Sequence, residues 1–224
     1  MHDGRRRKVA VVDDDEVVRD SLRFLLAAAG YDVLAFGSAG EFLSSEYDAN
    51  SEPIDPNGRA SYIERYIHQE IYRAGPDVRA VVHSHSQAVI PFADTQIALQ
   101  PMNHIAAFLG GGAPVFDMRS AGGDGTDTLI RNNALGTALA QTLGRHTVAL
   151  MRGHGSVAVG PTLKHVVYRA VYAEVDARIE AEALSMGGKP EFLSPGGAEA
   201  ATKTTDKLVE RPWELWKRHA ERAK

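Results

Sequence analysis

The sequence predicts an α/β fold. Short runs rich in β-branched residues, typical of buried strands, alternate with longer segments whose apolar residues recur at helical spacing. Three such runs are Val9–Val12, Val78–Val82 and Val148–Met151. Clusters of glycine and proline separate the segments. This alternation is typical of a sheet that packs against helices.

Composition narrows the classes of function. The 224 residues correspond to one or two domains, and an apolar fraction of 44% allows a sizeable core. A net charge of -4 gives no reason to propose nucleic acid as a partner. With no cysteine, disulfides and thiolate metal sites are excluded, so a metal would need nitrogen and oxygen ligands. No membrane span or signal-peptide core is visible, and a cytoplasmic protein is expected.

The first 45 residues read as strand, helix, strand, helix. Val9–Val12 and Tyr31–Phe36 are the expected strands. The helix between them follows from the spacing of Val17, Leu22, Leu25 and Leu26, and Phe42 and Leu43 belong to a second, short helix. This order is typical of the opening of a parallel α/β unit.

Two motifs in this stretch resemble the first part of a response-regulator receiver domain. They are Lys8–Asp15, a strand followed by an acidic cluster, and Gly30–Val33, a turn into the next strand. The resemblance implies that Asp13 and Asp14 hold magnesium. Beyond Leu43 the sequence has no match for the phosphoacceptor aspartate of a receiver. The simpler interpretation is that the acidic cluster ends a strand and caps a helix.

A change in composition divides the chain into three parts. Residues 1–45 form the incomplete receiver-like βαβα fragment. Residues 46–58 are a polar junction with the turn signals Pro53 and Asn57-Gly58. Residues 59–224 form a second domain with a C-terminal helical tail.

The second domain has its own series of expected elements. Helices are predicted over 60–74, 103–109 and 127–143, from 160–162 to Gly187, and from about Arg211; strands end at His83, Phe116 and Met151. For the helix after Gly160, the predicted buried stripe consists of Val166, Val167, Ala170, Val171 and Val175.

Histidines and one glutamate around these strands have the spacing of a metal site. Residues two apart on a strand point to the same face, so His83 and His85 can reach one ion. His154, flanked by glycines, follows a later strand, and Glu64 lies on the preceding helix. Three imidazoles and a carboxylate are typical ligands of a divalent metal with an open position. The other histidines, His68 among them, are interpreted as ordinary core or surface residues.

These residues lie in motifs that resemble the class II aldolase/adducin family. The motifs are Glu64–His68, Ala80–His85 and His154-Gly155. The resemblance runs from about Ser51 to the C-terminus, and family enzymes have the same separation between glutamate and first histidine. It implies a three-layer α/β/α fold and a homotetramer. His83, His85 and His154 would be ligands of zinc (manganese or cobalt as alternatives), and Glu64 a fourth ligand or the acid/base group.

Three further residues are candidates for substrate binding. His104 precedes a glycine cluster, and Arg131 and Arg152 lie in segments near the metal motifs. Arginine suits carboxylates because its guanidinium binds them with two parallel hydrogen bonds. The alternative interpretations are an interface or core role for the histidine and structural ion pairs for the arginines.

The predicted function is that of a metal-dependent lyase. Aldol cleavage and decarboxylation both leave a carbanion or enolate that a divalent cation stabilises. The substrate would be a small hydroxy-carbonyl compound or a hydroxy-aromatic acid. Two alternatives remain open: an inactive, adducin-like binding module, and a phosphorelay module that uses the acidic cluster.

Overall fold

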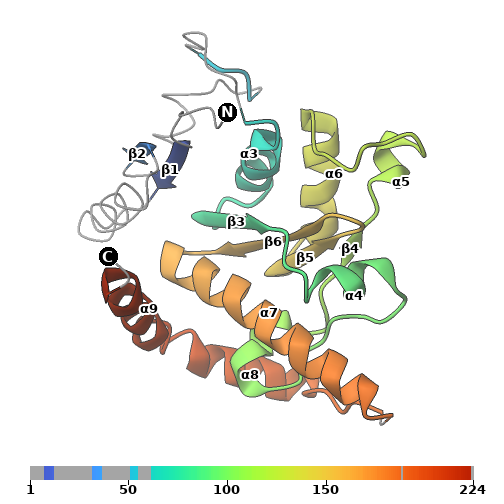
Figure 1. The fold of residues 1–224 in the computed structure, drawn as a ribbon, viewed down its shortest axis with the longest axis vertical. Coiled ribbons are helices and arrows are strands. Elements are labelled where there is room, and N and C mark those ends of the chain that lie inside the picture. Colours follow the sequence, from blue (N-terminus) through green and yellow to red (C-terminus); the bar gives the residue numbers. More distant parts are fainter. Residues whose placement is uncertain (1–7, 13–31, 37–50, 55–61, 188, 223–224) are drawn as a thin grey trace, which may run out of the picture. The chain divides into compact units, whose positions relative to one another are not determined.

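The protein is seen here in a computed structural model that describes residues 8–12, 32–36, 51–54, 62–187 and 189–222 (Figure 1). The chain divides into two compact units. One comprises Met1–Ala60 and Arg211–Lys224, and the other comprises Ser61–Glu210. None of the helices within the described ranges is long and apolar enough to cross a membrane.

The first unit contains a pair of parallel strands. β1 (Lys8–Val12) pairs with β2 (Asp32–Phe36), with Lys8 opposite Asp32. Both strands and their parallel direction agree with the sequence pattern. Helix α9 (Glu210–Arg222) begins within one residue of the predicted start at about Arg211. The two helices predicted near the strands, and with them Asp13 and Asp14, lie outside the described residues, so the magnesium role stays a prediction.

The second unit is built on a four-stranded mixed sheet. Its strands, in spatial order, are β3 (Ala80–Ser84), β6 (Gly155–Gly160), β5 (Val148–Met151) and β4 (Val115–Phe116). The pairings of β6 with β3 and with β5 are antiparallel, and β4 pairs parallel to β5. β6 was not predicted from the sequence, because glycines bound it and only two of its six residues are β-branched. Its central place brings the end of β3 beside the turn between β5 and β6.

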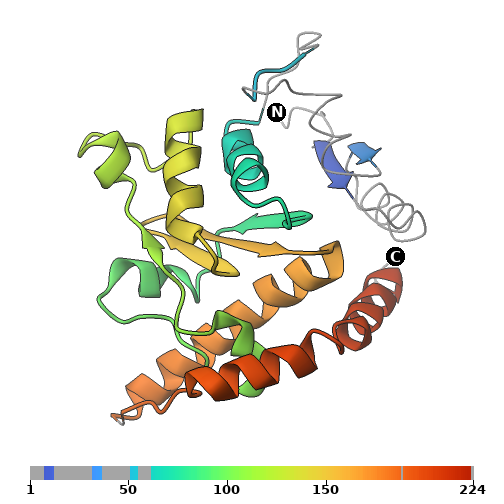
Figure 2. The same ribbon diagram turned by 180° about the vertical axis from the view of Figure 1, so that it is seen from behind.

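Helices cover both faces of this sheet, in the α/β/α layering that the family resemblance implied (Figures 1 and 2). On one face lie α3 (Arg65–Ala74) and α6 (Asn133–Leu143); on the other lies α7 (Leu163–Ser185), with the 3-10 helix η1 (His104–Leu109) and α8 (Pro195–Thr205). Two short helices, α4 (Ile90–Asp94) and α5 (Arg119–Gly122), lie in the connections.

The main core lies between the sheet and the pair α3 and α6. Ile67 of α3 and Leu139 of α6 are completely buried there against Ala149 and Met151 of β5. Alternate residues of β5 are outside this cluster yet equally buried, as expected for a strand with helices on both faces.

The buried face of α7 differs from the predicted stripe. Val166 is buried as expected, but Val171 and Val175 are 37% and 39% exposed. The buried face instead carries polar residues, Arg169, Asp176 and Glu180 among them. Arg169 donates a hydrogen bond to a backbone carbonyl of β6, and Asp176 and Glu180 accept hydrogen bonds from backbone N–H groups before η1. A hydrophobic pattern cannot reveal a helix face that is buried through polar contacts.

The helix predicted over 127–143 begins only at Asn133. The side chain of Asn132 accepts a hydrogen bond from Leu135 N at 2.9 Å and caps α6. Residues 127–132 form a loop in which Thr128 has a left-handed backbone (φ 64°). An asparagine cap therefore overrides the apolar pattern that extends upstream.

Gly136 allows α3 and α6 to approach closely. A Cβ atom there would lie 2.6 Å from Tyr66 O and 2.9 Å from Glu70 Cγ. We predict that Gly136→Ala lowers the free energy of unfolding by about 1–3 kcal/mol, because the helices must separate. Chemical denaturation would measure this. Gly196→Ala in α8, where nothing lies within 4 Å, is the matched control and should be neutral or slightly stabilising.

Two buried carboxyl groups on α7 hold the segment that leads into η1. Asp176, 0% exposed, accepts hydrogen bonds from Met102 N at 3.2 Å and Asn103 Nδ2 at 2.8 Å. Glu180 accepts one from Gln100 N at 3.1 Å. Burial raises the pKa of Asp176 from 3.8 to about 7, and the nearby charge of Glu180 adds to the rise.

This raised pKa predicts a dependence of stability on pH. Because the folded protein holds the Asp176 proton more tightly than the unfolded chain does, the stability that this group contributes is complete below about pH 4 and is lost as pH rises through about 7. Asp176→Asn keeps an oxygen acceptor but cannot ionise. The free energy of unfolding of wild type relative to the variant should therefore fall by on the order of 1–4 kcal/mol between about pH 4 and about pH 8. A constant difference in denaturation experiments would contradict this.

Candidate metal centre

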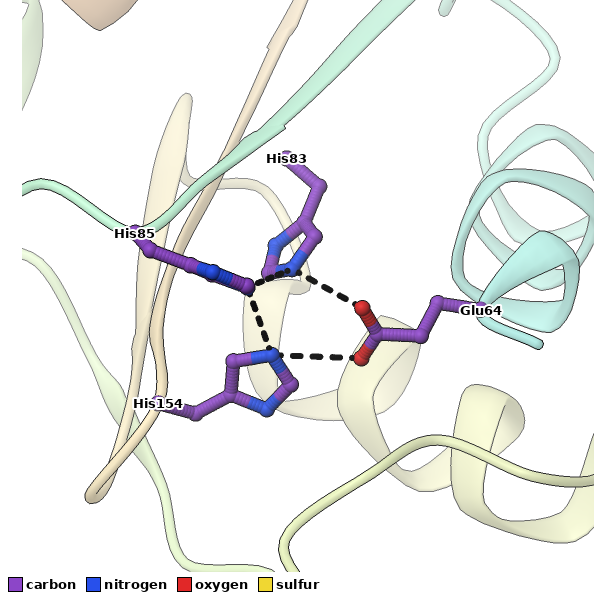
Figure 3. A group of neighbouring side chains, drawn as sticks. All are labelled: Glu64, His83, His85 and His154. Carbon is purple, nitrogen blue, oxygen red and sulfur yellow. Dashed lines mark hydrogen bonds and ion pairs between the residues drawn. The ribbon is translucent and has the colours of Figure 1, made fainter. Parts of the chain in front are cut away.

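Three separate segments deliver the predicted ligands to one place (Figure 3). Glu64 is the residue directly before α3, at its N-cap. His83 lies in β3, opposite Val157 of β6, and His85 follows the end of that strand. His154 lies in the tight turn between β5 and β6. Since β6 pairs with β3, the turn that precedes β6 lies beside the two histidines that end β3.

The ligand atoms of the four residues all lie within 4.8 Å of one another. His85 Nε2 is 3.0 Å from His83 Nε2 and 2.9 Å from His154 Nε2. The Glu64 carboxylate closes the ring, with Oε2 3.3 Å from His83 Nε2 and Oε1 3.2 Å from His154 Nε2. The structure therefore brings these four side chains together, and their role as metal ligands stays a prediction.

Backbone carbonyls determine which ring nitrogens of two histidines carry a proton. His83 Nδ1 donates to Ser156 O at 3.0 Å, and His154 Nδ1 donates to Thr128 O at 2.6 Å. A carbonyl oxygen can only accept, so Nδ1 is the protonated nitrogen and Nε2 of the neutral ring carries a lone pair. Metal-binding histidines are typically oriented in this way.

This arrangement fits a divalent metal ion. Lone pairs on neighbouring Nε2 atoms repel each other at these distances unless a cation or additional protons lie between them. Glu64 is 5% exposed, and its Oε1, 3.2 Å from His154 Nε2, gains a hydrogen bond only when that nitrogen carries a proton. A buried carboxylate oxygen and three converging imidazoles are the donor set that zinc and similar ions bind.

The electrostatics keep Glu64 and His85 in forms that can bind a metal, whereas His154 holds its proton more tightly. Burial acts to raise the pKa of Glu64, but hydrogen bonds and charge from His154 and His83 outweigh it, and the group stays a carboxylate. Burial, together with the charges of the other two histidines, lowers the pKa of His85. Burial acts to lower the pKa of His154 as well, but the contacts with Glu64 and Thr128 O raise it above its ordinary value.

Two neighbours of the cluster were not selected from the sequence. The Tyr62 hydroxyl donates to Glu64 Oε2 at 3.4 Å, and burial together with the Glu64 charge raises the pKa of this tyrosine to about 12. His68 lies one turn after Glu64, and burial plus the charge of His83 lowers its pKa to about 4. Nothing in the sequence pointed to Tyr62 as a neighbour of the cluster. The four-residue spacing of His68 from Glu64 did indicate that these two side chains share a helix face.

The structure does not bring the three candidate substrate-binding residues into this cluster. His104 is exposed at the start of η1. Arg131 is paired with Asp127, and Arg152 Nε lies 3.2 Å from Asp117, which also binds Arg119. The arginines thus form the structural ion pairs named above as their alternative role, and their part in substrate binding stays a prediction.

Residues 24–181 match the family described as the class II aldolase and adducin N-terminal domain. The chain belongs to the class II aldolase and adducin family. The match begins at residue 24, whereas the motifs had placed the start of the family resemblance near Ser51. It therefore includes part of the segment interpreted as receiver-like. The receiver resemblance is therefore not supported.

Two curated relatives with similar sequences are decarboxylases by name. Decarboxylase tropJ of Talaromyces stipitatus is 36% identical over 192 residues, which cover 77% of this chain and 72% of the relative. A 3,4-dihydroxyphthalate decarboxylase of Terrabacter sp. is 27% identical over 163 residues, covering 69% of this chain and 64% of the relative, just under two thirds. These matches confirm the expected reaction class, a carbon–carbon lyase of the class II aldolase type.

A solved structure agrees with the fold. An aldolase II superfamily protein from Pseudomonas syringae superimposes with a TM-score of 0.61 at 21% identity, over 80% of this chain and 73% of that one. The mixed α/β fold of the class II aldolases is thus confirmed. Enzymes of this type use a divalent metal, and the His/Glu cluster is the candidate site for it.

The glycines on either side of His154 have separate structural reasons. Gly153 has φ 64°, which most side chains disfavour, and its N–H donates to Asp94 Oδ1 at 2.8 Å. Gly155 lies so close to β3 that a Cβ atom would be 2.2 Å from Ser84 O. The first glycine turns the chain toward the cluster, and the second lets β6 pair with β3 beside it.

We predict that Gly155→Ala damages the metal centre without altering a ligand. The added methyl group must push β6 from β3 and disturb the His83 contact with Ser156 O. Metal affinity, measured by competition with a chelator, should fall about tenfold or more, as is typical when the hydrogen bonds that orient metal ligands are disturbed. Gly111→Ala, where nothing lies within 4 Å, is the control. Equal affinity in the two variants would contradict the close-approach argument.

Proposed function

We propose that this protein is a divalent-metal-dependent decarboxylase of hydroxylated aromatic carboxylic acids, with zinc as its metal. The observation that carries the proposal is the cluster of three imidazoles and one carboxylate, two of whose rings are oriented by carbonyl groups. The names of the two curated relatives support decarboxylation. Zinc suits a set of nitrogen and oxygen donors that includes three histidines, and manganese or cobalt are the alternatives.

The chemistry makes definite demands on the site. When the bond from the ring to the carboxyl group breaks, carbon dioxide leaves and the electron pair stays on the ring carbon, which must then take up a proton. A bound divalent ion supplies positive charge that stabilises the negative charge developing on the substrate oxygens. In this proposal His83, His85 and His154 hold that ion, and Glu64 is a fourth ligand or accepts the proton of a substrate hydroxyl.

Tyr62 adds a protic group at the same place. Its hydroxyl lies 3.4 Å from Glu64 Oε2 and is protonated at neutral pH, as that of an ordinary tyrosine is, and the rise of its pKa to about 12 keeps it so at higher pH. Tyr62 is only half-buried, with 53% of its surface exposed, so a substrate can still reach it. In the proposed reaction this hydroxyl binds and orients the substrate beside the carboxylate.

Other functions predict other results. An aldolase with the same site would cleave a sugar phosphate, and an adducin-like module would bind metal without turnover. The phosphorelay alternative rests on Asp13 and Asp14, which lie outside the described residues. The homotetramer and the cytoplasmic location remain predictions, and light scattering of the purified protein would test the former.

The proposal predicts that metal and activity are lost together. Purified wild type should contain about one zinc per chain by elemental analysis, and His83→Ala should lose it because a ligand is removed. His146→Ala, which changes an exposed histidine outside the cluster, should retain the metal. Wild type and the control should release carbon dioxide from hydroxybenzoic or dihydroxyphthalic acids, and His83→Ala should not.

Two outcomes would overturn the proposed reaction. Cleavage of sugar phosphates with no release of carbon dioxide would identify an aldolase. Bound metal with no turnover of either substrate class would favour the binding module. A folded wild type that takes up no metal, even after incubation with zinc, would contradict the metal site itself.

A further inference from the structure

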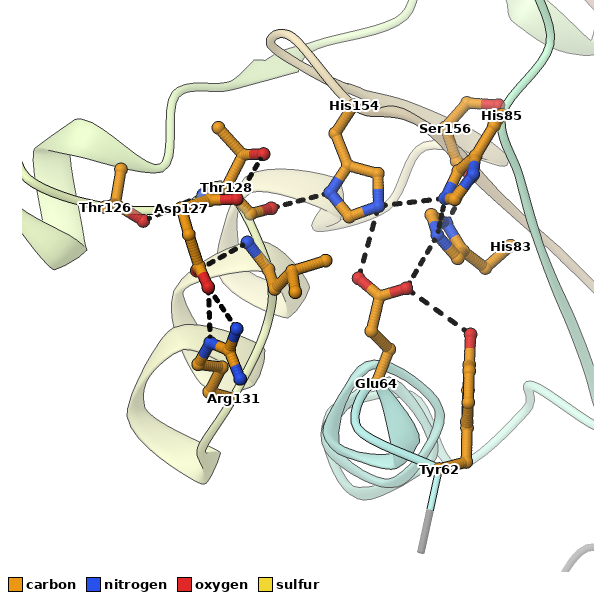
Figure 4. A network of polar contacts seen from close by, with 11 residues as sticks. Tyr62, Glu64, His83, His85, Thr126, Asp127, Thr128, Arg131, His154 and Ser156 are labelled. Atoms are coloured by element: carbon orange, nitrogen blue, oxygen red, sulfur yellow. Dashed lines mark hydrogen bonds and ion pairs between the residues drawn. The ribbon is translucent and has the colours of Figure 1, made fainter. Parts of the chain in front are cut away.

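His154 is supported by a loop, unlike the other oriented histidine. His83 contacts the carbonyl of Ser156, which is part of the ladder between β3 and β6. His154 instead contacts Thr128 O, at 2.6 Å, in the connection between α5 and α6 (Figure 4). The orientation of one ring therefore depends on the sheet, and that of the other depends on the conformation of residues 126–131.

The backbone of Thr128 is strained. Its φ of 64° lies in the left-handed region, where a β-branched residue is rarely found. Such a conformation persists only when the surrounding structure imposes it, and it is often found where function requires a particular geometry. Here it directs the Thr128 carbonyl at His154 Nδ1.

Contacts within the loop impose this conformation. Thr128 N donates to Thr126 Oγ1 at 3.2 Å, and Thr128 Oγ1 donates to Asp127 O at 2.7 Å. The Asp127 carboxylate accepts from Leu129 N and is paired with Arg131. Ile130, 0% exposed in the main core, anchors the end of the loop.

Arg131 can therefore influence the metal centre without contacting it, through its effect on the loop. Its guanidinium binds Asp127 on the side of the loop away from the histidines (Figure 4). The pair is exposed, so removing it should change global stability little. The ion pair does, however, link Asp127, directly before Thr128, to Arg131, directly after the buried Ile130.

We propose that loop 126–131 is a positioning element for the metal centre: the strained Thr128 carbonyl, held by the Asp127–Arg131 pair, fixes the Nδ1–H tautomer of His154 and thereby sets the affinity for the metal. This inference rests on the proposed metal site and adds residues that are not ligands. A carbonyl that holds Nδ1–H directs the Nε2 lone pair into the cluster and increases its basicity.

Paired variants test the role of the Thr128 backbone. Thr128→Pro fixes φ near -65° and removes the carbonyl from His154, whereas Thr128→Asn tolerates the left-handed conformation and should keep it. With zinc as the probe and a competing chelator, the proline variant should bind about tenfold or more weakly. The asparagine variant should stay within about twofold of wild type, because its carbonyl keeps its place.

A second pair tests the ion pair that holds the loop. Arg131→Ala should weaken zinc binding by about two- to fivefold, the range expected for loss of an exposed salt bridge. Arg119→Ala is the matched control, since Arg119 forms a similarly exposed pair with Asp117 outside the loop, and it should leave affinity unchanged. This pair keeps the test decisive if Thr128→Pro fails to fold.

A spectroscopic signal separates positioning from general stability. In metal-free protein labelled with nitrogen-15 histidine, His154 should show a protonated, hydrogen-bonded Nδ1, which Thr128→Pro removes and Thr128→Asn retains. If wild type binds zinc and all four variants bind it equally, the positioning role is overturned and the metal site stands. If wild type binds no zinc, both proposals fail.

Discussion

The convergence of unprotonated imidazole nitrogens is the constraint on which the candidate site depends. Two carbonyl groups hold the protons of His83 and His154 on the far side of each ring, so the Nε2 atoms meet with lone pairs facing one another. Only a cation or extra protons relieve that repulsion. The neighbouring carboxylate of Glu64 favours positive charge at the same point. Geometry and charge thus both favour metal binding.

The second unit provides this convergence through close backbone approaches. Gly155 lets β6 lie against β3, and Gly136 lets α6 lie against α3, the helix that directly follows Glu64. On the far face of the sheet, buried carboxyl groups of α7 replace the apolar contacts that a hydrophobic stripe would make. These carboxyl groups accept hydrogen bonds from the backbone N–H groups of Gln100 and Met102, so the helix and the segment before η1 are held together by hydrogen bonds.

Local patterns in the sequence predicted much of the fold. The strands ending at His83 and Met151 were predicted because β-branched runs are visible in isolation, and the short helix at 103–109 was predicted where η1 lies. The stripe assigned to α7 was wrong at Val171 and Val175, and the start of α6 was placed too early. Both errors arose where a polar side chain, in a buried contact or in a cap, overrode the apolar period.

By itself, the sequence indicated which four side chains would meet, because strand periodicity and motif spacing are local properties, and the reaction class followed from the family that those motifs resemble. Only the tertiary structure decided that β6 lies between β3 and β5, that Tyr62 reaches Glu64, and that Thr128 O supports His154. Such contacts join residues whose separation in the chain carries no signal. They depend on how strands pair and on a strained backbone angle, which the assembled fold alone imposes.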